Sequence, residues 1–188
     1  MDKKYELTEP SIEYLDKRLF RIRAIRDFGD VQKGELGGFV ESENNLSHEG
    51  NCWIYDDGVV CDNGKVCDNG KVFWHSVVCD NGIVCDNGKV SGNGVVGDYG
   101  VVLDNVVIRG NAVVKSIEDY IVFKNNWSSG RYFTWTKSNN MWSVGCFYGT
   151  GEELIEKAYK DSEESGRKYE SYVKFVEENF CKRELSRR

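Results

Sequence analysis

The sequence predicts a mainly β fold, in which a short parallel β-helix carries an N-terminal β cap and a C-terminal module of β-meander plus helix. The first observation is a six-residue repeat that runs without an insertion from Ile54 to about Ile117. The second is the turn sequence Asp-Asn-Gly, which recurs within the repeat. The third is a change of pattern after Tyr120. These observations divide the chain into a cap at 1–47, a β-helix at 48–119 and a C-terminal module at 120–188.

The segment before the repeat contains one alternating stretch, from Arg18 to Arg26. Phe20, Ile22 and Ala24 share one face, and Arg21 and Arg23 share the other, which is strand periodicity. Glycine-containing sequences at 27–30 and 33–38 are typical of turns. We expect this segment to cover the open end of the β-helix, because an uncovered end exposes strand edges and apolar core.

The repeat favours short strands separated by corners. Each block begins with an aliphatic residue, and its fifth position is small in most blocks. A strand alternates sides every two residues, so six residues make a short strand and a corner. Asn and Gly accept the positive φ that a corner requires. The first positions are Ile54, Val60, Val66, Val72, Val78, Val84, Val90, Val96, Val102, Ile108 and Val114.

Three blocks close a triangular coil, so residues eighteen apart are expected to stack about 4.8 Å from one another. An aliphatic residue followed four places later by a small one resembles the hexapeptide-repeat family. That resemblance implies a left-handed parallel β-helix. It also implies a homo-oligomer, a trimer in particular.

Composition narrows the function classes. The 188 residues carry a net charge of −6, which argues against direct DNA binding. The N-terminal residues do not look like a signal peptide, and no apolar stretch suits a membrane. Seven cysteines cannot all pair within the chain, and Cys61/Cys79 and Cys67/Cys85 are each eighteen apart, which favours a reducing cytosol. No short paired Cys spacing predicts a zinc site, so neither metal nor cofactor is expected.

Two features of the repeat are candidates for function. Phe73-Trp74-His75-Ser76 replaces the usual turn in one block and places an indole and an imidazole on the surface. His75 is the candidate general base if the protein is an acyltransferase, as in some hexapeptide-repeat enzymes. The second feature is two stacked acidic ladders, which with Trp74 form a candidate protein-binding surface that mimics a nucleic-acid backbone. They are Asp62, Asp80, Asp98 and Asp68, Asp86, Asp104.

The C-terminal module reads as three strands, at 120–123, 131–136 and 141–147, followed by helix. Thr150 and Glu153 form a capping box at the start of that helix. Gly166 suggests either a kink or two helices. The module is rich in aromatic and basic residues, which suit stacking on bases and pairing with phosphates. With the arginines of the cap, the candidate ligand-binding set is Arg21, Arg23, Arg26, Trp127, Arg131, Trp135, Lys137 and Trp142.

The flanks resemble a group of small phage and prophage proteins, through RIRAIRDFGDVQKGELGGFVESENNLSHEGNCWIYD and NNWSSGRYFTWTKSNNMWSVGCFYGTGEELIEKAY. This resemblance implies a phage origin and a location in the cytoplasm of the host bacterium. It implies no established activity.

We therefore predict a non-catalytic protein that inhibits host antiviral defence by sequestering a nucleotide-type immune signal. One alternative is an anti-CRISPR-type inhibitor that binds a host defence protein through the acidic ladders. The other is an enzyme related to hexapeptide acyltransferases. No catalytic residues are assigned, because two histidines and these spacings assemble no recognisable catalytic set.

Overall fold

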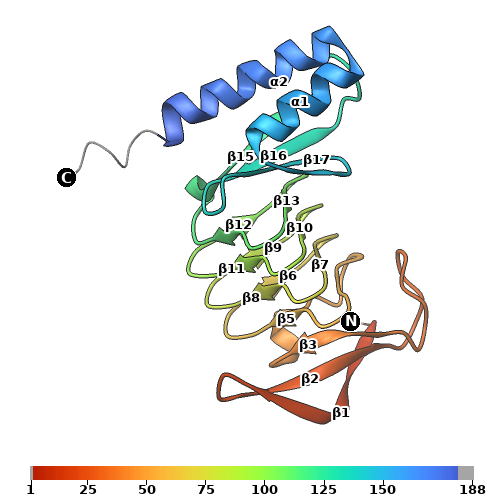
Figure 1. The fold of residues 1–188 in the computed structure, drawn as a ribbon. Helices are drawn as coiled ribbons and strands as arrows, with labels where there is room; N and C mark the ends of the chain where they lie inside the picture. The colour runs from red at the N-terminus through yellow and green to blue at the C-terminus, as the bar shows by residue number, and fades with distance from the viewer. Residues whose placement is uncertain (1, 182–188) are drawn as a thin grey trace, which may run out of the picture. The chain divides into compact units, whose positions relative to one another are not determined.

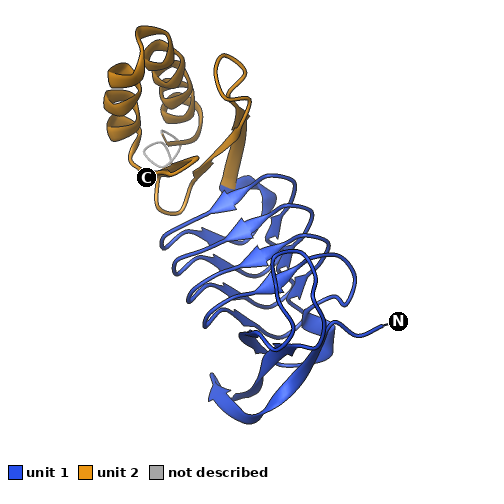
Figure 2. Ribbon diagram, turned by 90° about the vertical axis from the view of Figure 1, so that its right-hand side faces the viewer, with its two compact units in different colours: residues 1–119 blue, residues 120–188 orange. Residues whose placement is uncertain are grey.

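The computed structural model describes residues 2–181, and the chain divides into two compact units, Met1–Asp119 and Tyr120–Arg188 (Figure 2). The first unit is a parallel β-helix with an antiparallel cap. The second is an antiparallel sheet with two α-helices. The mainly β fold class is thereby confirmed.

The β-helix is made of two-residue parallel strands that stack in three sheets (Figure 1). Partners are eighteen residues apart, as in the pairing of Val90 with Val72 and Ile108. The strands are β4 (Trp53–Ile54), β5 (Val59–Val60), β6 (Lys65–Val66), β7 (Lys71–Val72), β8 (Val77–Val78), β9 (Ile83–Val84), β10 (Lys89–Val90), β11 (Val95–Val96), β12 (Val101–Val102), β13 (Val107–Ile108) and β14 (Val113–Val114).

The first residue of each block points into the β-helix. Val84, Val90 and Val96 are all 0% exposed, as the aliphatic pattern requires. The corners turn at the third position, which has positive φ, for example Asp62 at 56° and Asp86 at 50°. The small fifth position has a steric cause, because a Cβ on Gly82 would lie 2.4 Å from the carbonyl oxygen of Val96. The repeat is therefore a hexapeptide-repeat β-helix.

The cap contains more strand than the sequence indicated. Strands β1 (Tyr5–Tyr14), β2 (Lys17–Ala24) and β3 (Leu36–Val40) extend one sheet of the β-helix in the order β1-β2-β3-β5-β8-β11-β14. The prediction of a turn over 33–38 is wrong at its end, because Leu36 to Gly38 belong to β3. Gly38 reads as turn sequence, yet a Cβ there would lie 2.3 Å from the carbonyl oxygen of Gly58. A glycine is required at this position because the backbones of Gly38 and Gly58 lie too close together for a side chain. A short 3-10 helix, η1 (Glu43–Asn45), follows β3.

After η2 (Ile117–Asp119), the second unit begins with an antiparallel sheet of β15 (Tyr120–Lys124), β16 (Tyr132–Thr136), β17 (Met141–Val144) and β18 (Phe147–Gly149). The expected third strand over 141–147 is instead a hairpin, because the chain reverses at Gly145, where φ is 57°.

Two helices follow the sheet, α1 (Gly151–Asp161) and α2 (Glu163–Val176), and the chain continues as a π-helical turn, η3 (Glu177–Cys181). The break lies at Ser162, which ends α1 and caps α2 through the N–H of Ser165. It does not lie at Gly166, which is buried within α2 against the ring of Tyr159. The Thr150–Glu153 capping box is present at the start of α1. No helix within residues 2–181 is long and apolar enough to cross a membrane.

Candidate functional site

Trp74 and His75 form the one corner of the β-helix that departs most from the repeat. The backbone of Trp74 has a positive φ of 55°. At the equivalent corner position, seven other corners of the described chain carry Asp with positive φ. A bulky side chain at positive φ is strained, and such strain gathers at functional sites. Trp74 is 57% exposed, and the residues stacked next to it in the two following coils are Gly92 and Gly110, which have no side chains. The ring is therefore presented to solvent at an energetic cost.

His75 lies beside Trp74 with its side chain exposed, while its backbone N–H donates to the carbonyl of Gly92 at 3.1 Å. It occupies the ladder position that carries Asn in the two coils that follow, where Asn93 Nδ2 donates to Asn111 Oδ1 at 3.0 Å. In the coil before it, the same position is Asp57. The imidazole of His75 thus lies on a corner of the β-helix, next to the carboxylate-bearing residue Asp57 of the preceding coil.

Arg21, from the cap, reaches the same corner. Its Nη1 lies 3.5 Å from Asp57 Oδ1, and its Nη2 donates to the carbonyl of Asp56 at 3.1 Å. The guanidinium stacks 4.9 Å from the centre of the Phe39 ring, and its Nε is buried without a partner. The carboxylate of Asp56 accepts the backbone N–H of Trp74 at 3.2 Å. One corner therefore combines a cation, two carboxylates, an indole and an imidazole.

Sequence reasoning singled out Arg21, Trp74 and His75 but did not join them, and it missed Asp56 and Asp57. The repeat period could have placed Asp57 in the rung below His75, since they are eighteen residues apart. The approach of Arg21 depends on how β2 docks onto the β-helix, which no local pattern encodes.

His48 is the other histidine, and its surroundings are structural. Its ring stacks on Tyr5 at 4.2 Å, and its Nδ1 accepts the backbone N–H of Lys4 at 3.3 Å. Burial lowers the pKa of this imidazole from its ordinary value. A side chain held in this way inside the cap is poorly placed to meet a substrate.

The other arginines of the candidate ligand set lie apart from this corner. Arg23 is exposed and pairs with Glu6 across the β1–β2 hairpin. Arg26 is exposed just after β2. Because Arg23 already has an anionic partner, the basic face predicted for this strand is partly neutralised.

The aromatic members of that set mostly form the core of the second unit. Trp135 and Trp142 are each 1% exposed and pack with Phe133, Leu154 and Val173. Trp127 is half-buried and stacks on Tyr172 at 5.8 Å. These rings cover α1 and α2 within the unit. Arg131 and Lys137 are exposed at opposite ends of the β16 segment.

The two acidic ladders differ in their partners. Asp62 pairs with Lys17, and Asp98 pairs with Lys115 at 3.3 Å, so the first ladder is neutralised at both ends. Asp80, in its middle, accepts the backbone N–H of Asp98 at 3.2 Å. Within residues 2–181, no ion pair involves Asp68, Asp86 or Asp104 of the second ladder.

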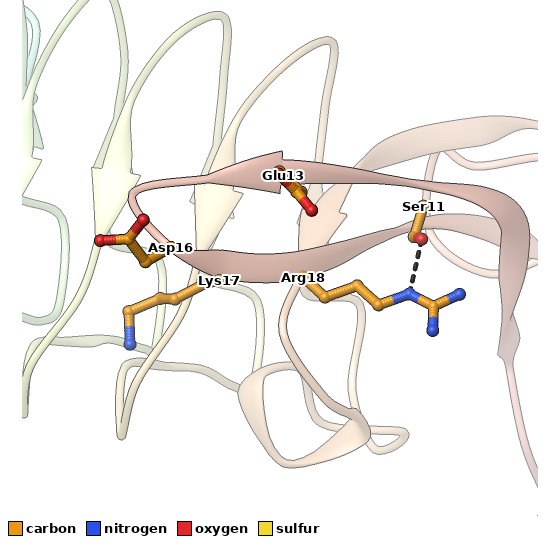
Figure 3. Close-up of a pocket in the computed structure, with 5 residues that line it drawn as sticks. All are labelled: Ser11, Glu13, Asp16, Lys17 and Arg18. Carbon is orange, nitrogen blue, oxygen red and sulfur yellow. Dashed lines mark hydrogen bonds between the residues drawn. The ribbon is translucent and has the colours of Figure 1, made fainter.

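A shallow hollow lies at the β1–β2 hairpin, lined by Ser11, Glu13, Asp16, Lys17 and Arg18 (Figure 3). Its cations already have partners. Arg18 Nε donates to Ser11 Oγ at 2.6 Å, as Figure 3 shows, and Lys17 pairs with Asp62. Nothing in this hollow is free to bind an anion strongly.

Comparison with known proteins gives one partial likeness. A stretch of 42 residues, 22% of the chain, is 50% identical to an uncharacterized acetyltransferase, YdcK, of Escherichia coli (strain K12). The match spans 13% of that protein's length. No protein-family model matches the chain.

This likeness agrees with the hexapeptide-repeat β-helix. It contradicts the prediction that the protein is not an enzyme, because the similar protein bears the name of an acetyltransferase. A phage origin, an anti-defence role and a location in a host cytoplasm have no support in the comparison and stay predictions.

Proposed function

We propose that the protein transfers an acyl group from a thioester such as acetyl-coenzyme A, with the Trp74–His75 corner as its site. The observation that carries the proposal is an exposed imidazole beside a strained, solvent-facing indole. The named acetyltransferase that shares part of the sequence supports the same class of reaction.

Each group at the corner has a role in this reaction. His75 is the general base that accepts the proton of an acceptor amine or hydroxyl. As the acceptor attacks the thioester carbonyl, a bond from its nitrogen or oxygen to the acyl carbon forms and the carbon–sulfur bond breaks. The imidazolium then returns the proton to the departing thiolate. Trp74 supplies an apolar surface, and Arg21 supplies the positive charge for an anionic part of a substrate.

The alternative of nucleotide sequestration receives less support from the geometry. Trp135 and Trp142 are buried in the core of the second unit, and Arg23 pairs with Glu6. Few of the residues proposed to bind a nucleotide are therefore accessible to one. The acidic-ladder hypothesis stays a prediction.

The test is acyl transfer from acetyl-coenzyme A to a panel of amines and hydroxyl compounds, followed through the release of free thiol. His75→Ala is expected to lower kcat by roughly 10²–10⁴ while leaving the fold intact, as removal of a general base does. Asn93→Ala, on the same ladder in the next coil, is the matched control and should keep full activity. If wild-type protein neither binds acetyl-coenzyme A nor releases thiol, or if both variants behave alike, the proposal is wrong.

A further inference from the structure

A second corner of the β-helix brings together two cysteine thiols and a carboxylate, which take no part in the proposed acyl transfer. Cys67 follows β6 and Cys85 follows β9, and these strands pair in register, so the two thiols sit on adjacent rungs. Asp68 comes next after Cys67. One ligand atom from each of Cys67, Asp68 and Cys85 lies within 4.8 Å of the other two.

We propose that Cys67, Asp68 and Cys85 bind a divalent metal ion, zinc in particular, with its fourth position open to solvent. Thiolates select zinc over the hard cations magnesium and calcium. Zinc–sulfur bonds of about 2.3 Å in a tetrahedron put two sulfurs about 3.8 Å apart, so the two sulfurs need to close in by at most about 1 Å. Both cysteines are half-buried and Asp68 is exposed, which leaves one side of the site accessible.

The charge of this corner is an independent observation that points to a cation. Asp68, Asp86 and Asp104 stack on successive rungs, and like charges in this arrangement destabilise a sheet unless they are compensated. The ladder that contains Asp62 has Lys17 and Lys115 as counter-charges. The corner of Cys67 has no such counter-charge within residues 2–181, although Lys65 and Lys89 lie on neighbouring strands.

The neighbouring corner shows what a compensated version looks like. Cys61 and Cys79 are also stacked, and their sulfurs lie 3.5 Å and 3.4 Å from the carboxylates of Asp62 and Asp80. There, however, Cys61 is only 3% exposed, because it packs with Leu19 and Phe39. The carboxylate of Asp62 already forms an ion pair with Lys17. A metal ion would have to displace this lysine. Cys67 and Cys85 are thus the candidate metal site, and Cys61 and Cys79 are the matched control pair within the same molecule.

The sequence predicts no zinc site, because it lacks short paired Cys spacings. In a β-helix, residues eighteen apart become neighbours, so the relevant spacing is one full coil. Metal binding releases the thiol protons. The affinity is therefore expected to increase as the pH rises.

Cobalt(II) is the probe for the test, because thiolate ligation gives a sulfur-to-metal charge-transfer band and tetrahedral geometry gives intense visible bands. Reduced wild-type protein is expected to show both bands and to lose them on addition of zinc. The variant Cys67→Ser/Cys85→Ser should lose the bands, and Asp68→Asn should weaken binding at least tenfold. The variant Cys61→Ser/Cys79→Ser should retain them.

A second readout is the melting temperature, which zinc should raise in wild-type protein and in Cys61→Ser/Cys79→Ser but not in Cys67→Ser/Cys85→Ser. Circular dichroism verifies that each variant is folded. The proposal is overturned if wild-type protein gives no thiolate band, or if the band survives in Cys67→Ser/Cys85→Ser.

Discussion

The ammonium group of Lys4 lies 3.0 Å from the carbonyl oxygen of Cys52 and 3.2 Å from its sulfur, fully buried beneath the first coil. It also donates to the carbonyls of Glu49 and Gly50 at 3.2 and 3.3 Å. Burial lowers the pKa of this lysine. The N-terminal strand is thus fastened to the irregular loop that closes the end of the β-helix.

Replacing this lysine tests how much the fastening contributes. Lys4→Met is expected to reduce the free energy of unfolding by about 1–3 kcal/mol, because three carbonyl oxygens lose a charged donor. Lys3→Met is the matched control, since Lys3 makes an exposed pair with Glu43 and should cost less than about 1 kcal/mol. Urea denaturation measures both. Equal effects would contradict a stabilising role for Lys4.

The interior ladder is tested by a buried charge. Val84→Asp places a carboxylate at a position that is 0% exposed among other valines, so we expect the β-helix to unfold at room temperature. Asn93→Asp puts the same group on an exposed corner and should leave melting nearly unchanged. Circular dichroism during heating distinguishes them, and unchanged melting of Val84→Asp would refute the buried position.

The strain at Trp74 gives a prediction of opposite sign. Trp74→Asn should stabilise the protein by about 1 kcal/mol, because Asn accepts positive φ more readily than a bulky residue. Asp86→Asn, at an equivalent corner, is the control and should change stability little. If the indole serves acyl transfer, the same variant should lose activity as it gains stability. A less stable Trp74→Asn protein would show that the indole is retained for packing.

The buried thiol of Cys61 and the half-buried thiol of Cys79 are expected to make the protein less stable at high pH. Burial raises the pKa of Cys61 to about 12 and that of Cys79 to about 11. Thiols of the unfolded chain ionise at about pH 8.5, so above that pH the native state holds protons that the unfolded chain releases. This contribution is complete below about pH 8.5 and is lost as the pH rises towards 12.

The measurement is the free energy of unfolding in urea across this pH range. Cys61→Ser/Cys79→Ser is expected to show a smaller decrease than wild-type protein. Cys146→Ser removes an exposed thiol and should follow the wild-type curve. The same slope in all three proteins would refute the contribution of Cys61 and Cys79.

The homotrimer stays a prediction. Light scattering should give a mass of three times 21.5 kDa at micromolar concentration. The measurement should be repeated in low and high salt, because the acidic corners of neighbouring subunits would repel one another in low salt. A mass of one chain under both conditions would exclude the trimer.

The sequence by itself determined the β-helix, its register and its buried ladders. Each six-residue block repeats the same local choices of aliphatic strand, positive φ at the corner and small fifth residue, and identical neighbours leave only one way to stack. The strand at Leu36–Val40, the reversal at Gly145 and the helix break at Ser162 were not determined locally, because they depend on contacts between segments with different patterns.

The candidate sites divide in the same way. The departure at Trp74 and His75 and the stacking of Cys67 over Cys85 follow from the period alone. The tertiary structure decided which carboxylates form ion pairs with the cap. Lys17 and Arg21 come from a hairpin that docks onto two of the three corners. Likewise, Trp135 and Trp142 look like ligand-binding residues until two helices bury them. Burial of that kind depends on long-range packing, which no spacing in the sequence records.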